Sequence, residues 1–600
     1  MSTTISFNQQ NVATLLSSGD EHQFVIPEYQ RPYAWGNEQA QTLFEDIWDF
    51  ALNKGGSKRS SERYFLGCIV SYKNELDEQE IIDGQQRITS LFLLLRAIYT
   101  QLDGMRVKPE EADNFIMKIA PTIWRAHKLK GNINYSDILI VSRVISNEGN
   151  EILRKILETG HADEKAKDNY SRNYILFQKL YYEHSAQEPL VVYDFIYALL
   201  YQAIVLPITA DNQDTALTIF STLNNRGLPL SDADIFKAKI YNHLPEDEKK
   251  TFISTWQELM EEAERAGESV QNLFYYYMFF LRACENDRNT TTPGVRKYYS
   301  ADNFKRLFAE NLMDMLKTIV NLLKITNKRI DTELDEVWVR DIKIRQAFDI
   351  LNYYPNEFGK YPVIIYFLAH HEEKDFAVHF RTFLYKFLRE IIVKYVLAPS
   401  VSAVKSDILN LNAMIIQSNH PPFEFKRLDE ANLENALIKP HNKTVRMLLS
   451  AHAYYYCNQN SLLPNNPIWE IEHILPQKWQ EAFFPTESKE TVEEKINNIG
   501  NKMPFEKKLN IRASNGFFDK KKEEYKQSHI AVAKEMSSYP SHDWNLEDIS
   551  KRNIRITDTL LQLFAAWDSD YDAAFSSEKP SPTPEQLRQI EEFKRNGWIH

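Results

Sequence analysis

This sequence has few cysteines and a negative net charge, and each of these features excludes a class of protein. The 600 residues contain only three cysteines, Cys68, Cys284 and Cys457, which are far apart and form no Cys-X-X-Cys pair. This argues against a disulfide framework and a cysteine-ligated zinc site, and it fits a reducing cytoplasm. The net charge of −12 excludes a basic protein that coats nucleic acid, so any contact with nucleic acid must come from local patches.

Long apolar runs are also missing. The most apolar segments, such as 91–95 and 363–369, are far shorter than the roughly 18–20 residues of a membrane-spanning helix. The N-terminus has no basic region followed by an apolar one, so we expect no signal peptide. We therefore expect a cytoplasmic protein without a membrane partner.

The composition is that of a large and mostly helical protein. Hydrophobic residues make up 43% and charged residues 26% of the chain, aromatic residues reach 12%, and there are only 17 glycines. Six hundred residues exceed one ordinary core, so we expect several domains. The segments that differ in pattern are 1–240, a helical middle at 241–440, a region at 441–550, and a helical tail with a Pro-rich linker at 551–600.

A strand that ends in Asp83-Gly84-Gln85-Gln86-Arg87 and leads into a helix is the first informative motif. Gly84 permits a tight turn, and apolar residues follow at helical spacing from Ile88 to Leu102. The turn places Gln85, Gln86 and Arg87 at a helix N-terminus, which favours an anion, and Arg87 could bind a phosphate with two hydrogen bonds. The alternative is an Asp-Gly turn with Arg87 in a nearby salt bridge, and spacing alone favours that alternative.

A second polar turn follows at 224–227. Asn224 and Arg226 precede Gly227, and Ser231 resembles the start of a capping box. These two side chains either brace the turn or complete the pocket that begins at Asp83.

Three segments in the N-terminal part resemble the N-terminal domain of the GmrSD-type, modification-dependent restriction enzymes. They are 31–35 (Arg-Pro-Tyr-Ala-Trp), 83–91 and 220–227, in that order. The resemblance covers about 10–240 and implies a ParB/sulfiredoxin-like fold that binds and hydrolyses nucleotides and helps to recognise modified DNA. It also implies a nucleotide pocket, with GTP or ATP as ligand, whose residues are Arg31, Asp83, Gly84, Gln85, Gln86, Arg87, Asn224 and Arg226.

The stretch from Ile471 to Trp479 is the second informative motif. Glu472 and His473 end a short predicted strand, and Asn501 and Asn510 follow before and within a predicted helix. This order suits a one-metal phosphodiesterase site, in which oxygen ligands hold the metal and the imidazole deprotonates water.

A local excess of positive charge follows this motif. Segment 499–528 carries eight Lys or Arg against four Asp or Glu, although the chain as a whole is acidic. A phosphate backbone could bind there. A solvated helical face is the usual alternative for such a run.

The full order of these residues resembles the HNH nuclease domain that accompanies the N-terminal domain in GmrSD-type enzymes. The resemblance implies a ββα-metal fold with His473 as general base and with Glu472 and Asn510 as ligands of Mg²⁺ or Mn²⁺. It further implies that Asn501 fixes the loop and that Lys520 or Lys521 contacts phosphate. The fold class is therefore α+β, multidomain and predominantly helical.

We expect a nucleotide-regulated, metal-dependent DNA endonuclease with NTPase activity that nicks or cuts modified phage DNA. One HNH site cuts one strand, so double-strand breaks would need a homodimer or two successive events. Two alternatives stay open. One is a nucleotide-dependent DNA-binding adaptor with an inactive nuclease domain, and the other is an unregulated nuclease with a structural anion site.

Overall fold

The computed structural model describes residues 6–17, 23–55, 62–126, 132–144, 149–213, 215–217, 219, 232–329, 336–426, 428, 430–456, 459–480 and 483–574. The chain divides into two compact units, Met1–Trp256 and Gln257–His600. The predicted divisions at 440 and 550 both lie inside the second unit. The predicted Pro-rich linker after 574 lies outside the described residues.

A mixed sheet forms the centre of the first unit. Its strands are β1 (Ser6–Phe7), β2 (Gln10–Asn11), β3 (Phe24–Ile26), β4 (Tyr64–Lys73), β5 (Gln79–Asp83), β8 (Ile140–Ser142) and β9 (Ala203–Ala210). The order is β1-β9-β4-β5-β3-β8, with β2 also paired to β9. β4 runs parallel to β9 and antiparallel to β5, so the turn after β5 starts at an interior strand of the sheet.

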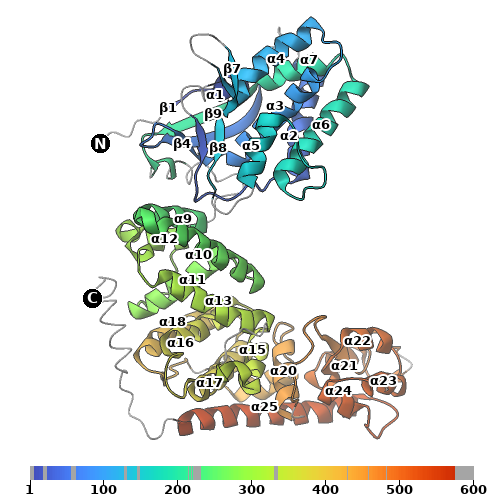
Figure 1. The fold of residues 1–600 in the computed structure, drawn as a ribbon. Coiled ribbons are helices and arrows are strands. Elements are labelled where there is room, and N and C mark those ends of the chain that lie inside the picture. The colour runs from blue at the N-terminus through green and yellow to red at the C-terminus, as the bar shows by residue number, and fades with distance from the viewer. Residues whose placement is uncertain are drawn as a thin grey trace. The chain divides into compact units, whose positions relative to one another are not determined.

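Helices cover this sheet, and a small ribbon of β6 (Trp124–Ala126) and β7 (Ile133–Ile138) lies beside them. The helices are α1 (Val12–Ser17), α2 (Asn37–Phe50), α3 (Gln85–Asp103), α4 (Glu110–Ile123), α5 (Gly149–Thr159), α6 (Asn169–Gln187), α7 (Val192–Tyr197) and α9 (Asp232–His243). Two π-helical turns, η2 (Ala51–Gly55) and η3 (Ala198–Gln202), complete the set, and α10 (Glu246–Arg265) crosses into the second unit. Figure 1 shows α2, α3 and α6 beside one another.

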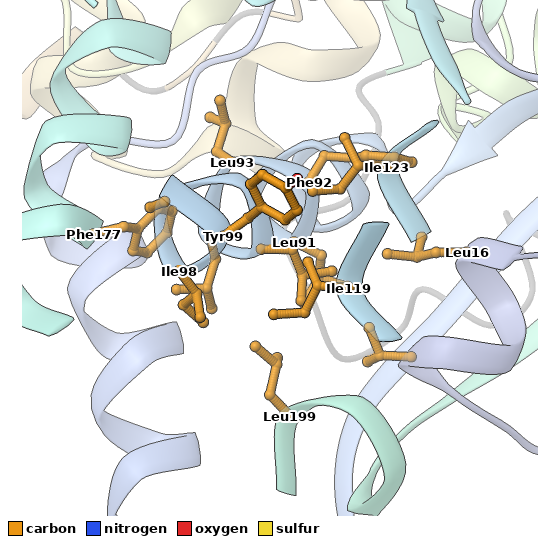
Figure 2. Packing of buried hydrophobic residues seen from close by; sticks show 14 of the residues in the cluster. Leu16, Leu91, Phe92, Leu93, Ile98, Tyr99, Ile119, Ile123, Phe177 and Leu199 are labelled. Atoms are coloured by element: carbon orange, nitrogen blue, oxygen red, sulfur yellow. The ribbon is translucent and has the colours of Figure 1, made fainter. Parts of the chain in front are cut away.

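Helix α3 is the core of the first unit. Its apolar residues are buried on all sides, because α4, α5 and α6 pack around it. Figure 2 shows Leu91, Phe92 and Tyr99 among side chains from other elements: Leu16 of α1, Ile119 and Ile123 of α4, Phe177 of α6 and Leu199 of η3. A helix enclosed in this way holds its N-terminus in a fixed position at the end of β5.

The second unit is almost entirely helical. Its first part contains α11 (Val270–Cys284), α12 (Val295–Ser300), α13 (Leu312–Lys328), α14 (Val337–Arg340), α15 (Ile342–Leu351), α16 (Tyr361–His370), α17 (Phe376–Leu397), α18 (Val401–Gln417), α19 (Leu433–Ile438) and α20 (Val445–Tyr456), with short 3-10 turns η4 (Ala301–Leu307), η5 (Glu357–Gly359) and η6 (Glu430–Asn432). Residues 274–281 of α11 are buried, except for the half-buried Tyr275.

The remaining elements surround one antiparallel strand pair. They are β10 (Glu470–His473), α21 (Lys489–Ile496), η8 (Ile499–Asn501), β11 (Lys502–Phe505), α22 (Lys507–Ala513), α23 (Phe518–Tyr525), α24 (Ala531–Met536) and α25 (Leu546–Ala574). In the part of the chain that the structure describes, no helix combines the length and apolarity that crossing a membrane requires.

Candidate functional site

Two strands and a helix bring the C-terminal motif together. β10 pairs antiparallel with β11, with His473 opposite Lys502 and Glu470 opposite Phe505. Helix α22 begins two residues after β11 and packs against β10. The short strand predicted to end at Glu472 and His473 is thereby confirmed as β10, and Asn510 lies on the helix that follows the strand pair.

A buried lysine holds the Glu472-His473 dipeptide. Lys521 Nζ donates to Glu472 Oε1 at 2.7 Å and to the carbonyl oxygen of His473 at 2.6 Å. The Tyr525 hydroxyl donates to the same carboxylate oxygen at 2.6 Å. Burial raises the pKa of Glu472, and Lys521 opposes that rise. The carboxylate of Glu472 therefore already faces a cation, which is supplied by α23.

The His473 imidazole stays neutral at neutral pH. Its Nε2 lies 3.3 Å from the amide nitrogen of Gln477. Burial lowers the pKa of His473 to about 4, and the charges of Lys502 and Lys521 act in the same direction. A neutral imidazole has a lone pair that can accept a proton from water.

The loop after His473 is held by Asn501. Its amide oxygen accepts from the Leu475 N–H at 2.7 Å and from Trp544 Nε1 at 3.2 Å. Its amide nitrogen donates to the carbonyl oxygens of Leu475 at 2.9 Å and Ile496 at 3.1 Å. These four bonds use the whole amide, so Asn501 orients the chain beside His473 and has no free donor or acceptor for a ligand.

Asn510 contacts a carboxylate other than Glu472. Its amide nitrogen donates to Glu470 Oε2 at 2.8 Å, and Lys507 Nζ lies 4.0 Å from Glu470 Oε1. Glu470 was missed by our reading of the sequence, although the period of two along a strand places it on the same face as Glu472. Of the two lysines predicted to contact phosphate, Lys520 is exposed and Lys521 is buried.

In the first unit, Gly84 forms the predicted turn between β5 and α3. Its φ is +86°, a left-handed conformation that favours glycine. A Cβ at this position would lie 2.8 Å from Cγ1 of Ile69, so the turn also packs closely against β4. The predicted strand at 80–82 and the helix from Ile88 to Leu102 are confirmed as β5 and α3.

Gln86 and Arg87 point to different neighbours. The Gln86 amide oxygen accepts from the N–H groups of Ala34 at 2.6 Å and Trp35 at 3.1 Å, and its nitrogen donates to the Pro32 carbonyl at 3.2 Å. Gln86 thus joins the loop at 31–36 to the start of α3. Arg87 Nη1 donates to the Cys68 carbonyl of β4 at 2.9 Å.

Asp83 lies half-buried among donors. Burial raises the pKa of Asp83, while the Gly84 N–H and the charges of Arg87 and Arg31 oppose the rise. The Gln85 side-chain oxygen is buried and has no hydrogen-bond partner within the described parts of the chain. The structure therefore brings four predicted site residues to the N-terminus of α3: Arg31, Asp83, Gln85 and Arg87. The side-chain oxygen of Gln85 is a hydrogen-bond acceptor that is not used within the described residues. Asn224 and Arg226 lie outside the described residues.

Comparison with protein families matches both informative parts of the chain. The model of the GmrSD restriction endonuclease N-terminal domain matches residues 12–241, and that of the GmrSD restriction endonuclease C-terminal domain matches residues 424–559. The chain belongs to the GmrSD restriction endonuclease family. No curated protein matches the chain. Membership of the GmrSD family supports a restriction nuclease role, with DNA as the partner.

Oxygen donors around β10 are the candidate ligands for a metal in this GmrSD-family chain. Among the residues that the structure describes, no group of three or more His, Cys, Asp or Glu could hold a metal. Mg²⁺ needs only one or two protein carboxylates when water and substrate phosphate complete the shell. The Glu470 carboxylate, which accepts a hydrogen bond from the Asn510 amide nitrogen, is a donor group of that kind, whereas Glu472 would first have to exchange Lys521 for the metal.

Proposed function

We propose that this GmrSD-family protein is a nucleotide-regulated, metal-dependent DNA endonuclease that nicks or cuts modified or foreign DNA in defence against phage. The β10–β11 pair followed by α22 supports an HNH-type, ββα-metal site. The mixed sheet around α3 supports a ParB/sulfiredoxin-like nucleotide-binding unit. The observation that carries the proposal is the position of His473 at the end of β10, next to Glu472 and to the loop that Asn501 fixes.

In this proposal His473 accepts the proton of the water that attacks the phosphate. Asn501 keeps the loop in place so that the imidazole has one orientation. Glu472 and Asn510 are the predicted ligands of Mg²⁺ or Mn²⁺, and we add Glu470 because its carboxylate lies 2.8 Å from the Asn510 amide. The bound metal would stabilise the negative charge that develops on the phosphate. Lys520 is exposed and would contact the DNA backbone.

At the other site, GTP or ATP would bind at the N-terminus of α3. The helix N-terminus and Arg87 would face phosphate, and the unpaired oxygen of Gln85 would accept a hydrogen bond from the ligand. Arg31, Asn224 and Arg226 would complete the pocket. Hydrolysis of the nucleotide would then control access to the nuclease site.

The first experiment is cleavage of modified phage DNA and unmodified DNA by the full chain, with Mg²⁺ or Mn²⁺ and with or without GTP or ATP. We expect the modified DNA to be cut, with a rate that changes with nucleotide. His473→Ala should abolish cleavage, and the control His529→Ala, an exposed histidine of the same region, should cut normally. Cleavage that survives His473→Ala would overturn the assignment of the base.

A second experiment separates regulated from unregulated cleavage. Arg87→Ala should remove the effect of nucleotide, whereas Arg154→Ala, an exposed arginine on α5, should retain it. Indifference of cleavage to every nucleotide and to Arg87→Ala would instead indicate an unregulated nuclease.

The proposed metal ligands are tested by a binding measurement that does not depend on DNA cleavage. Titration of Mn²⁺, followed by the loss of its free-ion paramagnetic resonance signal, should show weaker binding in Glu470→Gln and Asn510→Ala. Comparison with Glu472→Gln decides whether Glu472 exchanges Lys521 for the metal.

One observation favours the adaptor as second candidate. The Lys521 ammonium donates to Glu472 and to the His473 carbonyl, so it occupies the position that a metal ion would take at the Glu472 carboxylate. Nucleotide-dependent DNA binding without cleavage in any divalent metal would support an adaptor whose nuclease domain is inactive.

A further inference from the structure

Three large apolar side chains are exposed around the β10 site. Phe517 is 68% exposed, Ile511 is 64% exposed and Phe483 is 53% exposed. The rings of Phe483 and Phe517 are in contact, with centroids 5.6 Å apart and planes at 76°. We call Phe483 and Phe517 the aromatic tip; Ile511 is exposed on α22. Exposed apolar groups that gather at one place usually mark a binding surface.

The aromatic tip is attached to the residues of the candidate site. Phe517 directly precedes α23, and its carbonyl accepts the N–H of Lys521 at 3.0 Å. The same Lys521 donates its ammonium to Glu472 and to the carbonyl of His473. Phe517 is therefore joined to the proposed active site through the first turn of α23.

The turn that carries Phe517 is tight. The Gly516 N–H donates to the Ala513 carbonyl at 3.0 Å, and a Cβ on Gly516 would meet the same oxygen at 3.0 Å. Ser514, at the end of α22, has a positive φ of 45°. The turn thus fixes Phe517 between two helices, as a rigid support for a ring that projects into solvent.

Exposed lysines lie close in sequence to the aromatic tip, although the whole chain carries −12. They are Lys478 before Phe483, Lys507 and Lys508 at the start of α22, and Lys520 after Phe517, whereas the exposed Asp519 is paired with Lys522 and His542. An apolar tip with lysines on the neighbouring segments is complementary to a DNA duplex, whose phosphates flank the apolar faces of its bases. A second copy of this chain would bring like charges together around the tip, so the charge pattern favours DNA.

We propose that Phe517, supported by Phe483, inserts into a base step of double-stranded DNA beside the bond to be cut and unstacks it. Apolar side chains that enter a base step bend the duplex and change the groove width. The bend would move the adjacent phosphate away from its neighbours and towards His473. This inference rests on the proposed nuclease site, but unstacking can be measured without cleavage.

The test uses the full chain carrying His473→Ala, bound to end-labelled modified phage DNA in the presence of Mg²⁺. Permanganate oxidises unstacked thymines, and we expect new reactive thymines next to the position that the wild-type protein cuts. Adding Phe517→Ala should remove this reactivity, Phe517→Leu should retain part of it, and the exposed control Val337→Ala should retain all of it. In the wild-type background we expect Phe517→Ala to slow cleavage by roughly tenfold, since stacking contacts contribute about that much.

Several results would overturn the proposal. One is cleavage by Phe517→Ala and Phe483→Ala at the wild-type rate, and another is the absence of reactive thymines in the bound complex. A change from dimer to monomer in Phe517→Ala with unchanged permanganate reactivity would identify the tip as a self-association surface instead. Failure of the nuclease function looks different, because His473→Ala would then cut normally or the wild type would not cut, while unstacking could still be observed.

Discussion

Replacing Lys521 with methionine should locally unfold the nuclease region. The side chains of Lys521 and Glu472 are only 1% and 5% exposed, so the two charges are desolvated and depend on each other. Removing one partner of a buried pair leaves an unpaired charge and costs about 3–5 kcal/mol. The variant also loses the bond to the His473 carbonyl. Lys521→Met should therefore open the β10–α23 contact far more often than the wild type does.

Hydrogen exchange followed by mass spectrometry is a suitable assay, because the chain has two units and local opening is what changes. Peptides from 470–476 and 517–526 should exchange roughly 100- to 4,000-fold faster in Lys521→Met, which is that loss converted at 1.4 kcal/mol per factor of ten. The double variant Lys521→Met/Glu472→Gln should recover most of the protection, because no buried charge is left unpaired. Lys526→Met, an exposed lysine of the same segment, should behave like the wild type. Unchanged exchange in Lys521→Met would refute this reasoning.

Three further substitutions test other contacts. Asn501→Ala should destabilise the loop after β10 by about 2–4 kcal/mol, since four hydrogen bonds disappear, and hydrogen exchange in that loop measures the loss. Gly84→Ala should destabilise the first unit by at least about 1–2 kcal/mol, because φ is +86° and the new Cβ would meet Ile69; thermal unfolding tests this, and an unchanged melting temperature would contradict it. Gln86→Ala should release the loop at 31–36, which limited proteolysis would detect as faster cleavage there, whereas an unchanged digestion pattern would argue against the clamp.

Local patterns predicted the frame of both sites. The apolar spacing after Ile88 and the glycine before it define α3 and its turn, because both follow from the backbone and nearest neighbours alone. The partners of the polar side chains were not predictable in this way. Gln86 binds a loop about fifty residues earlier, and Glu472 binds a lysine about fifty residues later. Such pairs depend on the packing of whole elements, which no short motif records.

The pairing of Glu470 with Asn510 shows a related limit. The resemblance to HNH sites directs attention to the Glu-His pair, so the carboxylate two residues earlier received no role. Its contact with Asn510 depends on where α22 lies against β10, and that position is set by the turn after β11.

Helix α25 connects the nuclease-like elements of the second unit to its helical part. Near its start, Asn553 accepts from the Gly500 N–H at 2.7 Å, and Arg552 donates to the Gly500 carbonyl at 2.8 Å, next to Asn501. Near its end, Asp568 pairs with Lys386 of α17 at 2.7 Å. Figure 1 shows this helix running beneath the helices around α17 and the elements around β10 and β11.

A helix of 29 residues is about 43 Å long, so α25 works as a lever. The contacts at Asn553 and Asp568 are about 22 Å apart along the helix, so a tilt of about 5° at the α17 end would displace Asn553 by about 2 Å, enough to lengthen its hydrogen bond to Gly500 beyond bonding distance. Small changes in the helical middle of the chain would thus reach the loop that orients His473. A protein cut at residue 550 would keep only the first turn of α25 and would lose the contacts of Arg552, Asn553 and Asp568.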